Sequence, residues 1–227
     1  MGKKNIILLV GLIVLGLIIV IFFLSPSQQS SDLSDNINSS RDLSTNVSFT
    51  GNVSAEIPGD HVLGSYNSEN TIVEYASLTC PHCAIFHGEV FPKIKSELID
   101  KGKVKYIFRD FPIDPLAMAG SMIAHCSGDS KYFGVIDILL KTQDEWLFDN
   151  ENPYNGLLKV ARLAGLSEEN VKVCLSDNEL FSMIEGNQKL ASSRFGVNGT
   201  PAIFINNKKI SSLDFDTVMA ELGITAD

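Results

Sequence analysis

The hydrophobic pattern separates the N-terminal end of the chain from the rest. An unbroken apolar run from Ile6 to Leu24 contains no charged residue and follows Lys3 and Lys4. At a rise of about 1.5 Å per residue, a helix of this length matches the thickness of a bilayer core. Residues 1–24 are therefore predicted to form a transmembrane anchor, with a cleaved signal peptide as the alternative. The preceding lysines predict that the chain after this segment is exported.

A polar stretch follows the apolar run. Residues 25–57 are rich in Ser, Asn, Asp and Gln, and their apolar residues occur singly. A segment of this composition cannot bury enough surface to order itself, which predicts a flexible linker. The folded domain is expected over residues 58–225.

The first half of that domain has the pattern of a βαβ unit. Ile72–Ala76 is a short apolar run typical of a buried strand. Ala84–Ile99 has helical spacing, and Pro92 within it should kink the helix. Lys103–Phe111 alternates between apolar and polar residues, as a second strand would. Strand, helix and strand in this order predict two parallel neighbours in one sheet.

The second half is helical before it returns to strand. A helical insertion is predicted at about residues 115–196, and Ala202–Ile205 has strand character again. Asn206 and Asn207 then predict a turn into a short second strand. Phe215–Leu222 is amphipathic and predicts a closing helix. The fold class is therefore α/β, with a helical domain inserted into the sheet unit.

Composition and charge narrow the possible functions. The net charge is −9 and the basic residues are not clustered, which argues against a nucleic-acid partner. Four cysteines are too few for a disulfide scaffold. They form one close pair, Cys80 and Cys83, and one distant pair, Cys126 and Cys174.

The close pair stands where the predicted strand meets the predicted helix, as Cys80-Pro81-His82-Cys83. At the helix N-terminus, free N–H groups favour a thiolate on Cys80, which we expect to be exposed to water. Cys83 lies one turn inside and should be more buried. These positions predict that Cys80 exchanges with substrates and Cys83 resolves the mixed disulfide. Pro81 fits the first helical position, and His82 can add a hydrogen bond or positive charge beside the thiolate.

Glu74 is the only acid in the apolar strand that leads to the cysteines. We expect it to be buried beneath the cysteine pair as a proton acceptor or relay for Cys83, with Lys105 on the neighbouring strand as its partner. The alternative is an exposed carboxylate at the edge of the sheet.

Thr200-Pro201 opens the strand that follows the helical insertion. Proline is tolerated there because the first residue of a strand need not donate to the ladder. A cis bond at this position would leave the backbone of Thr200 free to pair with an extended substrate chain.

Together these motifs resemble the DsbA-like branch of the thioredoxin superfamily. The resemblance covers about residues 60–222 and rests on Thr71–Tyr75, the Cys-Pro-His-Cys tetrapeptide, the helical insertion and Gly199–Ala202. It implies a thioredoxin fold, a cis Pro201 opposite the disulfide and a buried acid at Glu74. It also implies oxidation of exported proteins and reoxidation by a membrane-embedded partner.

Two features differ from the simplest members of that family, namely the predicted anchor and the second cysteine pair. In an exported domain, Cys126 and Cys174 are expected to form a structural disulfide, and two buried free thiols are the alternative.

The sequence thus predicts an enzyme that introduces disulfide bonds into exported polypeptides through Cys80 and Cys83. Its expected location is the cell inner membrane, with one span and a periplasmic catalytic domain, or the periplasm if the N-terminal segment is cleaved. No cofactor and no metal are expected. A disulfide isomerase or reductase of the same fold is the first alternative. A metal-binding protein using Cys80, His82, Cys83 and His87 is the second.

Overall fold

The computed structural model describes residues 51–148 and 152–224, which belong to one compact unit. The predicted anchor at residues 1–24 and most of the predicted linker lie outside the described residues. Within the two described ranges, no helix combines the length and the apolar character needed to cross a membrane.

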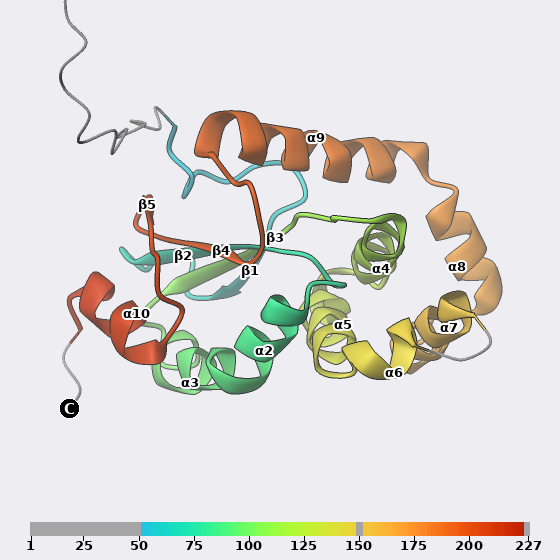
Figure 1. Cartoon of the computed structure of the whole chain (residues 1–227), viewed down its shortest axis with the longest axis horizontal. Coiled ribbons are helices and arrows are strands. Elements are labelled where there is room, and N and C mark those ends of the chain that lie inside the picture. Colours follow the sequence, from blue (N-terminus) through green and yellow to red (C-terminus); the bar gives the residue numbers. More distant parts are fainter. Residues whose placement is uncertain (1–50, 149–151, 225–227) are drawn as a thin grey trace, which may run out of the picture. The chain divides into compact units, whose positions relative to one another are not determined.

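A mixed five-stranded sheet forms the centre of this unit, in the order β1-β3-β2-β4-β5 (Figure 1). The two central strands β2 and β3 are parallel, and the other neighbours are antiparallel. Their bounds are β1 His61–Gly64, β2 Thr71–Ala76, β3 Lys105–Asp110, β4 Ala202–Ile205 and β5 Lys208–Lys209. The parallel pair confirms the predicted βαβ unit.

The helices fall into a group at the sheet and a group inserted between β3 and β4. Three helices and a π-helical turn belong to the first group: α2 Pro81–Glu89, α3 Phe91–Ile94, η1 Lys95–Ile99 and α10 Phe215–Leu222. The inserted group consists of α4 Pro115–Cys126, α5 Asp129–Lys141, α6 Gln143–Leu147, α7 Pro153–Leu163, α8 Glu168–Leu175 and α9 Asn178–Phe195. The α/β class and the helical insertion are as predicted.

The alternation of side chains along the strands creates two cores. Ile72 of β2 and Phe108 of β3 belong to the larger core, together with residues of α2, α3, α5 and α10. Val73 and Ile107 point to the other face of the sheet, where the core includes residues of α9 (Figure 1). Glu74 follows Ile72 by two residues, so it faces the larger core beneath α2.

Local sequence signals explain most element boundaries. The helix predicted over Ala84–Ile99 is broken at Val90, and Pro92 stands in the first turn of α3, which confirms the predicted kink. Asn206 and Asn207 have φ values of 48° and 73°, which suits the predicted turn between β4 and β5. The sequence did not predict β1 or the short helix α6.

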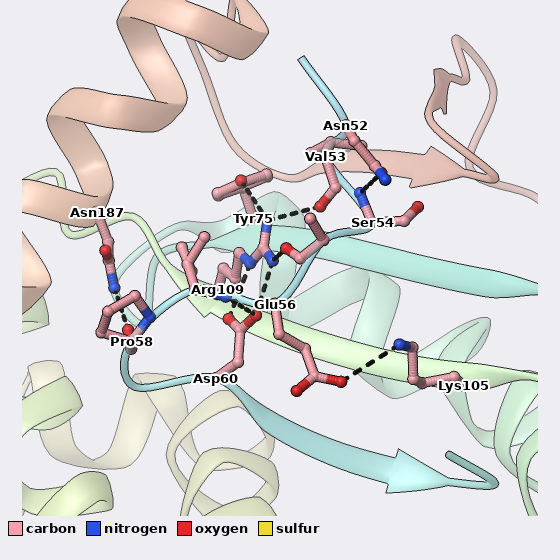
Figure 2. Close-up of polar contacts among 12 residues, drawn as sticks. Asn52, Val53, Ser54, Glu56, Pro58, Asp60, Tyr75, Lys105, Arg109 and Asn187 are labelled. Atoms are coloured by element: carbon pink, nitrogen blue, oxygen red, sulfur yellow. Dashed lines mark hydrogen bonds and ion pairs between the residues drawn. The ribbon is translucent and has the colours of Figure 1, made fainter. Parts of the chain in front are cut away.

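Arg109 of β3 fastens the start of the folded unit to the sheet (Figure 2). Its guanidinium binds the carboxylate of Asp60 through two N–H groups, at 2.8 and 2.7 Å. The other three N–H groups donate to the carbonyls of Val53 and Ala55 and to the hydroxyl of Tyr75, at 2.7–2.8 Å. All five donors of the buried side chain are therefore used.

This arrangement changes the predicted end of the linker. The sequence predicts a flexible linker over residues 51–57, because their apolar residues are isolated. In the structure Val53 is buried against the sheet, and Arg109 donates hydrogen bonds to the carbonyls of Val53 and Ala55. Buried Arg109 thus contributes to the order of a segment whose composition is otherwise typical of a linker.

We predict that Arg109→Met lowers the free energy of unfolding by about 3 kcal/mol, because it leaves the buried Asp60 carboxylate without its cation. Urea denaturation measures this change, and limited proteolysis should show faster cleavage within residues 51–60. Lys105→Met is the matched control on the same strand. Its partly exposed ion pair with Glu56, at 3.4 Å, is worth less than about 1 kcal/mol. Equal losses in the two variants would contradict the role given to Arg109.

Candidate active site

Cys80 and Cys83 lie at the junction predicted from the sequence. Strand β2 ends at Ala76, and Cys80 is the N-cap residue of α2, with extended backbone angles. Pro81 occupies the first helical position, where its missing N–H has no intrahelical acceptor to lose. The close cysteines are both free thiols. Cys80 is 5% exposed and Cys83 is fully buried, so Cys80 is more enclosed than expected but remains the more accessible of the two.

The two thiols have opposite electrostatic preferences. A hydrogen bond from Cys83 contributes most to lowering the pKa of Cys80 to about 5. The Thr200 side chain and the backbone N–H groups of Cys83 and His82 lower it further. The hydrogen bond with Cys80 raises the pKa of Cys83 most, and burial and the charge of Glu74 raise it further. The pKa of Cys83 is therefore far above that of a free cysteine. The pair therefore holds its negative charge on Cys80 and its proton on Cys83.

His82 stabilises the Cys80 thiolate through its backbone N–H, whereas the sequence predicts a contribution from its ring. Its ring is exposed to solvent, while its N–H points to the Cys80 thiolate at the start of α2. The stabilisation that the sequence assigned to the imidazole comes here from the helix N-terminus.

Thr200 and Pro201 face the cysteine pair from the start of β4. The peptide bond between them is cis. The Cys80 thiol donates to the Thr200 carbonyl at 3.3 Å, which joins two segments 120 residues apart in sequence. The structure therefore places the backbone of Thr200 beside the sulfur that the sequence predicts to be reactive.

Glu74 is fully buried and lies in the centre of the sheet, so the alternative of an exposed edge carboxylate is wrong. Its oxygens accept from His87 Nε2 at 3.1 and 3.2 Å and from the Tyr106 hydroxyl at 2.5 Å. Burial, followed by the charge of Glu74, raises the pKa of Tyr106 well above its ordinary value, which keeps this hydroxyl a donor. The predicted partner Lys105 is also wrong, because it binds Glu56 at 3.4 Å instead.

The helical insertion holds the loop that precedes Cys80. The buried side-chain amide of Gln143 in α6 donates to the carbonyls of Leu78 and Cys80, at 2.8 and 3.1 Å. Asp114, the N-cap of α4, accepts from the Thr79 hydroxyl and from the N–H of Ala117. Sequence reasoning missed these contacts, since neither residue carries a motif that points to Cys80.

The distant cysteines meet inside the insertion. A disulfide joins Cys126 at the end of α4 to Cys174 in α8, with the two Cα atoms 6.1 Å apart. Met118, Met122 and Ile184 surround it as a third, smaller core. The alternative of two buried free thiols does not hold.

His87, named from the sequence only as a ligand in the metal-binding alternative, is buried against Glu74. Its position four residues after Cys83 places both side chains on one face of α2, and this spacing is a signal the sequence contained. Throughout residues 51–148 and 152–224, no three His, Cys, Asp or Glu side chains are grouped to hold a metal ion.

Comparison with known proteins gives one consistent result. A family model described as thioredoxin matches residues 56–222. A "Putative protein-disulfide oxidoreductase" of Rickettsia bellii is 34% identical over 165 residues, which are 72% of this chain and 63% of that protein. A second protein of this description, from Rickettsia conorii, is 34% identical over 161 residues and 57% of its length. The chain therefore spans less than two thirds of these curated relatives.

Solved structures resemble the chain over a similar range. The crystal structure of Wolbachia pipientis alpha-DsbA1 is 31% identical with a TM-score of 0.69, covering 74% of this chain and 91% of that one. Oxidised BdbD from Bacillus subtilis is 27% identical with a TM-score of 0.54, covering 74% and 95%. The described fold is thus thioredoxin-like with a helical insertion.

The Cys80 thiolate predicts a specific pH dependence of alkylation. The rate at which iodoacetamide modifies the reduced protein should reach half its maximum near pH 5, because the thiolate is the nucleophile, and Cys83 should stay unmodified. Mass spectrometry of peptides from samples alkylated between pH 3 and 9 measures both rates. Cys83→Ala should move the midpoint upward, since it removes the strongest donor to Cys80. A wild-type midpoint near pH 8.5, as for a free cysteine, would refute this prediction.

Proposed function

Because this chain belongs to the DsbA-like branch of the thioredoxin superfamily, we propose that it is a thiol:disulfide oxidoreductase that introduces disulfide bonds into exported polypeptides. The observation that carries this proposal is the asymmetry of Cys80 and Cys83. One thiol has its pKa lowered to about 5 at the helix start, and the other is buried and keeps its proton.

The reaction begins with the Cys80–Cys83 disulfide. A substrate thiolate attacks Cys80 Sγ, a mixed disulfide forms, and the bond to Cys83 breaks. Cys83 receives the electron pair and takes up a proton. A second substrate thiolate then attacks the substrate sulfur of the mixed disulfide, which closes the substrate disulfide and releases Cys80 as a thiolate. Two electrons pass from the substrate to the cysteine pair.

The direction of transfer follows from the stability of that thiolate. Compared with a pair of ordinary cysteines, the reduced form gains stability as pH rises from about 5 to about 8.5, and it has no advantage below about 5. At pH 7 two units of pKa correspond to about 2.7 kcal/mol, which makes the couple more oxidising by up to about 60 mV. This supports a donor of disulfides over a reductase of the same fold, and the isomerase is separated from the donor by the experiment below.

Substrate binding is assigned to the backbone beside Cys80. In this proposal an extended substrate segment pairs with Thr200, at the open start of β4, and Pro201 keeps that end of the strand free of its own N–H donor. The position of the Thr200 carbonyl, 3.3 Å from Cys80 Sγ, supports this arrangement.

The proposed setting is the outer side of a cell membrane. The apolar run from Ile6 to Leu24 would anchor the chain in the cell inner membrane, or direct it to the periplasm if cleaved. The thiol form left after each reaction then requires reoxidation by a membrane-embedded partner. Cys80, as the more accessible thiolate, would attack a disulfide of that partner.

The proposed activity is tested with preoxidised protein and a reduced peptide containing two cysteines. The peptide should become oxidised in a one-to-one reaction, and the equilibrium with glutathione should lie at a potential above that of thioredoxin, about −270 mV. A potential at or below that value would refute the oxidase. Efficient refolding of scrambled ribonuclease with little oxidation of the peptide would instead identify an isomerase.

Glu74 is proposed to exchange the proton of Cys83. Glu74→Gln keeps the shape of the side chain and an oxygen for the Tyr106 hydroxyl but removes the base. We predict that it slows the attack of Cys83 on a mixed disulfide at Cys80 by about ten- to hundredfold. Stopped-flow reaction of the reduced protein with glutathione disulfide measures this step. Glu56→Gln, which alters an exposed carboxylate, is the control. Equal rates in wild type and Glu74→Gln would exclude the role.

A further inference from the structure

Two histidines from distant parts of the chain contact each other where the helical insertion meets the sheet. Nε2 of His61, in the edge strand β1, lies 3.1 Å from Nδ1 of His125, near the end of α4. The other nitrogen of His125 lies 2.9 Å from the carboxylate of Asp110, the last residue of β3. Nδ1 of His61 lies 3.5 Å from Asp129, in the first turn of α5. A line of four ionisable side chains therefore joins two strands to two helices.

The inner part of this line is enclosed, and its outer end is open to water. The side chains of Asp110, His125 and His61 are 7%, 9% and 13% exposed, whereas that of Asp129 is 98% exposed. The ring of His61 stacks on Tyr132 of α5, with the ring centroids 3.7 Å apart. The ring of His125 is held by Asp110. Each ring is thus fixed by a contact that does not involve the other ring.

The carboxylate of Asp110 is kept ionised by its surroundings. Burial alone would raise the pKa of Asp110, but the hydrogen bond and the charge of His125 outweigh burial, and the net shift is downward. Tyr132 donates to the same carboxylate at 3.1 Å. Burial, followed by the charge of Asp110, raises the pKa of Tyr132 well above its ordinary value, so this hydroxyl keeps its proton.

The remaining neighbours of the two rings leave the line of contacts unchanged. Asp60 directly precedes β1, and its carboxylate is bound by the guanidinium of Arg109. On the side of α9, the small cavity beside His125 is lined by Ile184 and Asn187, which do not titrate. The proton content of the line therefore depends on the two rings.

The contacts limit how many protons the two rings can hold. One proton lies on Nε2 of His125, because the ionised Asp110 can only accept a hydrogen bond. The contact between the rings needs one more, with a donor on one nitrogen and a lone pair on the other. A third proton fits on Nδ1 of His61, facing Asp129, and gives the pair one positive charge. A fourth would place two N–H groups face to face at 3.1 Å on two positive rings, and their hydrogen bond would be lost.

We propose that His61 and His125 form a one-proton lock that holds the helical insertion on the sheet, and that a second positive charge on the pair opens it. The closed lock is neutral or carries one charge, and both forms keep the hydrogen bond between the rings. When acid adds the second charge, the rings separate, and β1 and β3 lose their contact with the end of α4 and the start of α5. This inference does not depend on the proposed oxidoreductase activity.

The surroundings of His61 set the direction of the pH dependence. Burial, followed by the charge of His125, lowers the pKa of His61, although Asp129, Asp110 and Asp60 act in the opposite direction. A histidine whose pKa is lowered in the folded state stabilises the fold above about pH 6.5, the pKa of a free histidine. That contribution is lost as the pH falls below this value. The lock is therefore closed at neutral pH and opens in acid.

The number of protons on the pair is measured by NMR of full-length protein labelled with 15N-histidine. The chemical shifts of the ring nitrogens show which of them carry a proton. At pH 5, His82, whose ring is exposed, should carry a proton on both nitrogens and serves as the reference. His61 and His125 together should hold three protons on their four nitrogens.

Opening of the lock is measured by hydrogen exchange of the backbone amides in β1, at the end of α4 and at the start of α5. Between pH 5.5 and 4.5 the open form holds one proton more than the closed form. The opening constant obtained from the protection factors should therefore rise about tenfold over this interval. In His61→Gln the rise should be less than threefold, because the amide can donate to a neutral His125 and can turn to accept from a charged one.

Two further variants separate the lock from its surroundings. Asp129→Asn removes the exposed carboxylate at the outer end and keeps both rings, so the tenfold rise should persist. His61→Phe retains an aromatic ring to stack on Tyr132 and leaves one titratable ring in the pair, so it should lose the rise as His61→Gln does. If neither His61 variant folds, the proton count in the wild-type protein decides the question.

The outcomes test the lock without reference to the cysteines. Three protons on the pair at pH 5, together with the loss of the rise in His61→Gln, support it. Four protons on the pair in the folded protein overturn it, and so does an equal rise in wild type and His61→Gln. Loss of the rise in Asp129→Asn also overturns it, because the acid response would then come from that carboxylate. A protein that shows the predicted titration but oxidises no peptide would refute the proposed function and leave the lock in place.

Discussion

A carboxylate with no contact to water lies in the central strand of the sheet, directly below the cysteine pair. Removing a charge from water is costly unless donors surround it, so the elements near Glu74 must supply them. His87 from α2 and Tyr106 from β3 do so. Glu74 of β2 thus holds α2 and β3 against its own strand through these hydrogen bonds. The same carboxylate is one of the groups that raise the pKa of Cys83. The charge that constrains the core thus adds to the hydrogen bond with Cys80 and to burial in keeping the proton on the inner thiol.

The helical insertion also holds the loop that carries Cys80, through contacts that do not involve Glu74. Gln143 and Asp114 belong to helices far from β2 in sequence, yet both bind the four residues before α2. The disulfide between Cys126 and Cys174 joins α4, which begins after Asp114, to α8 of the insertion. One of the two helices that hold the active-site loop is thus itself cross-linked. The insertion acts as a support for the loop as well as a cover for the sheet.

Strand and helix patterns were enough to predict the βαβ unit, the position of Cys80 and the burial of Glu74. The prediction that Lys105 is the partner of Glu74 is wrong, because successive side chains of β3 alternate between the two faces of the sheet. Glu74 is opposite Phe108 in the register, and Phe108 and Tyr106 share its face, whereas Lys105 points to the other face. The role of Gln143 could not be predicted in this way, because it depends on how helices separated by loops pack in three dimensions.

The same parity separates two charged clusters along β3. Arg109 points to the face covered by α9, where it fixes residues 51–60, and Tyr106 points to the face covered by α2, where it binds Glu74. Both clusters are buried, but they share no side chain and no cavity. A change at Arg109 acts on the attachment of the N-terminal segment, whereas a change at Glu74 acts on the thiols. Positions of opposite parity on one strand therefore divide stability and redox chemistry between the two faces of the sheet.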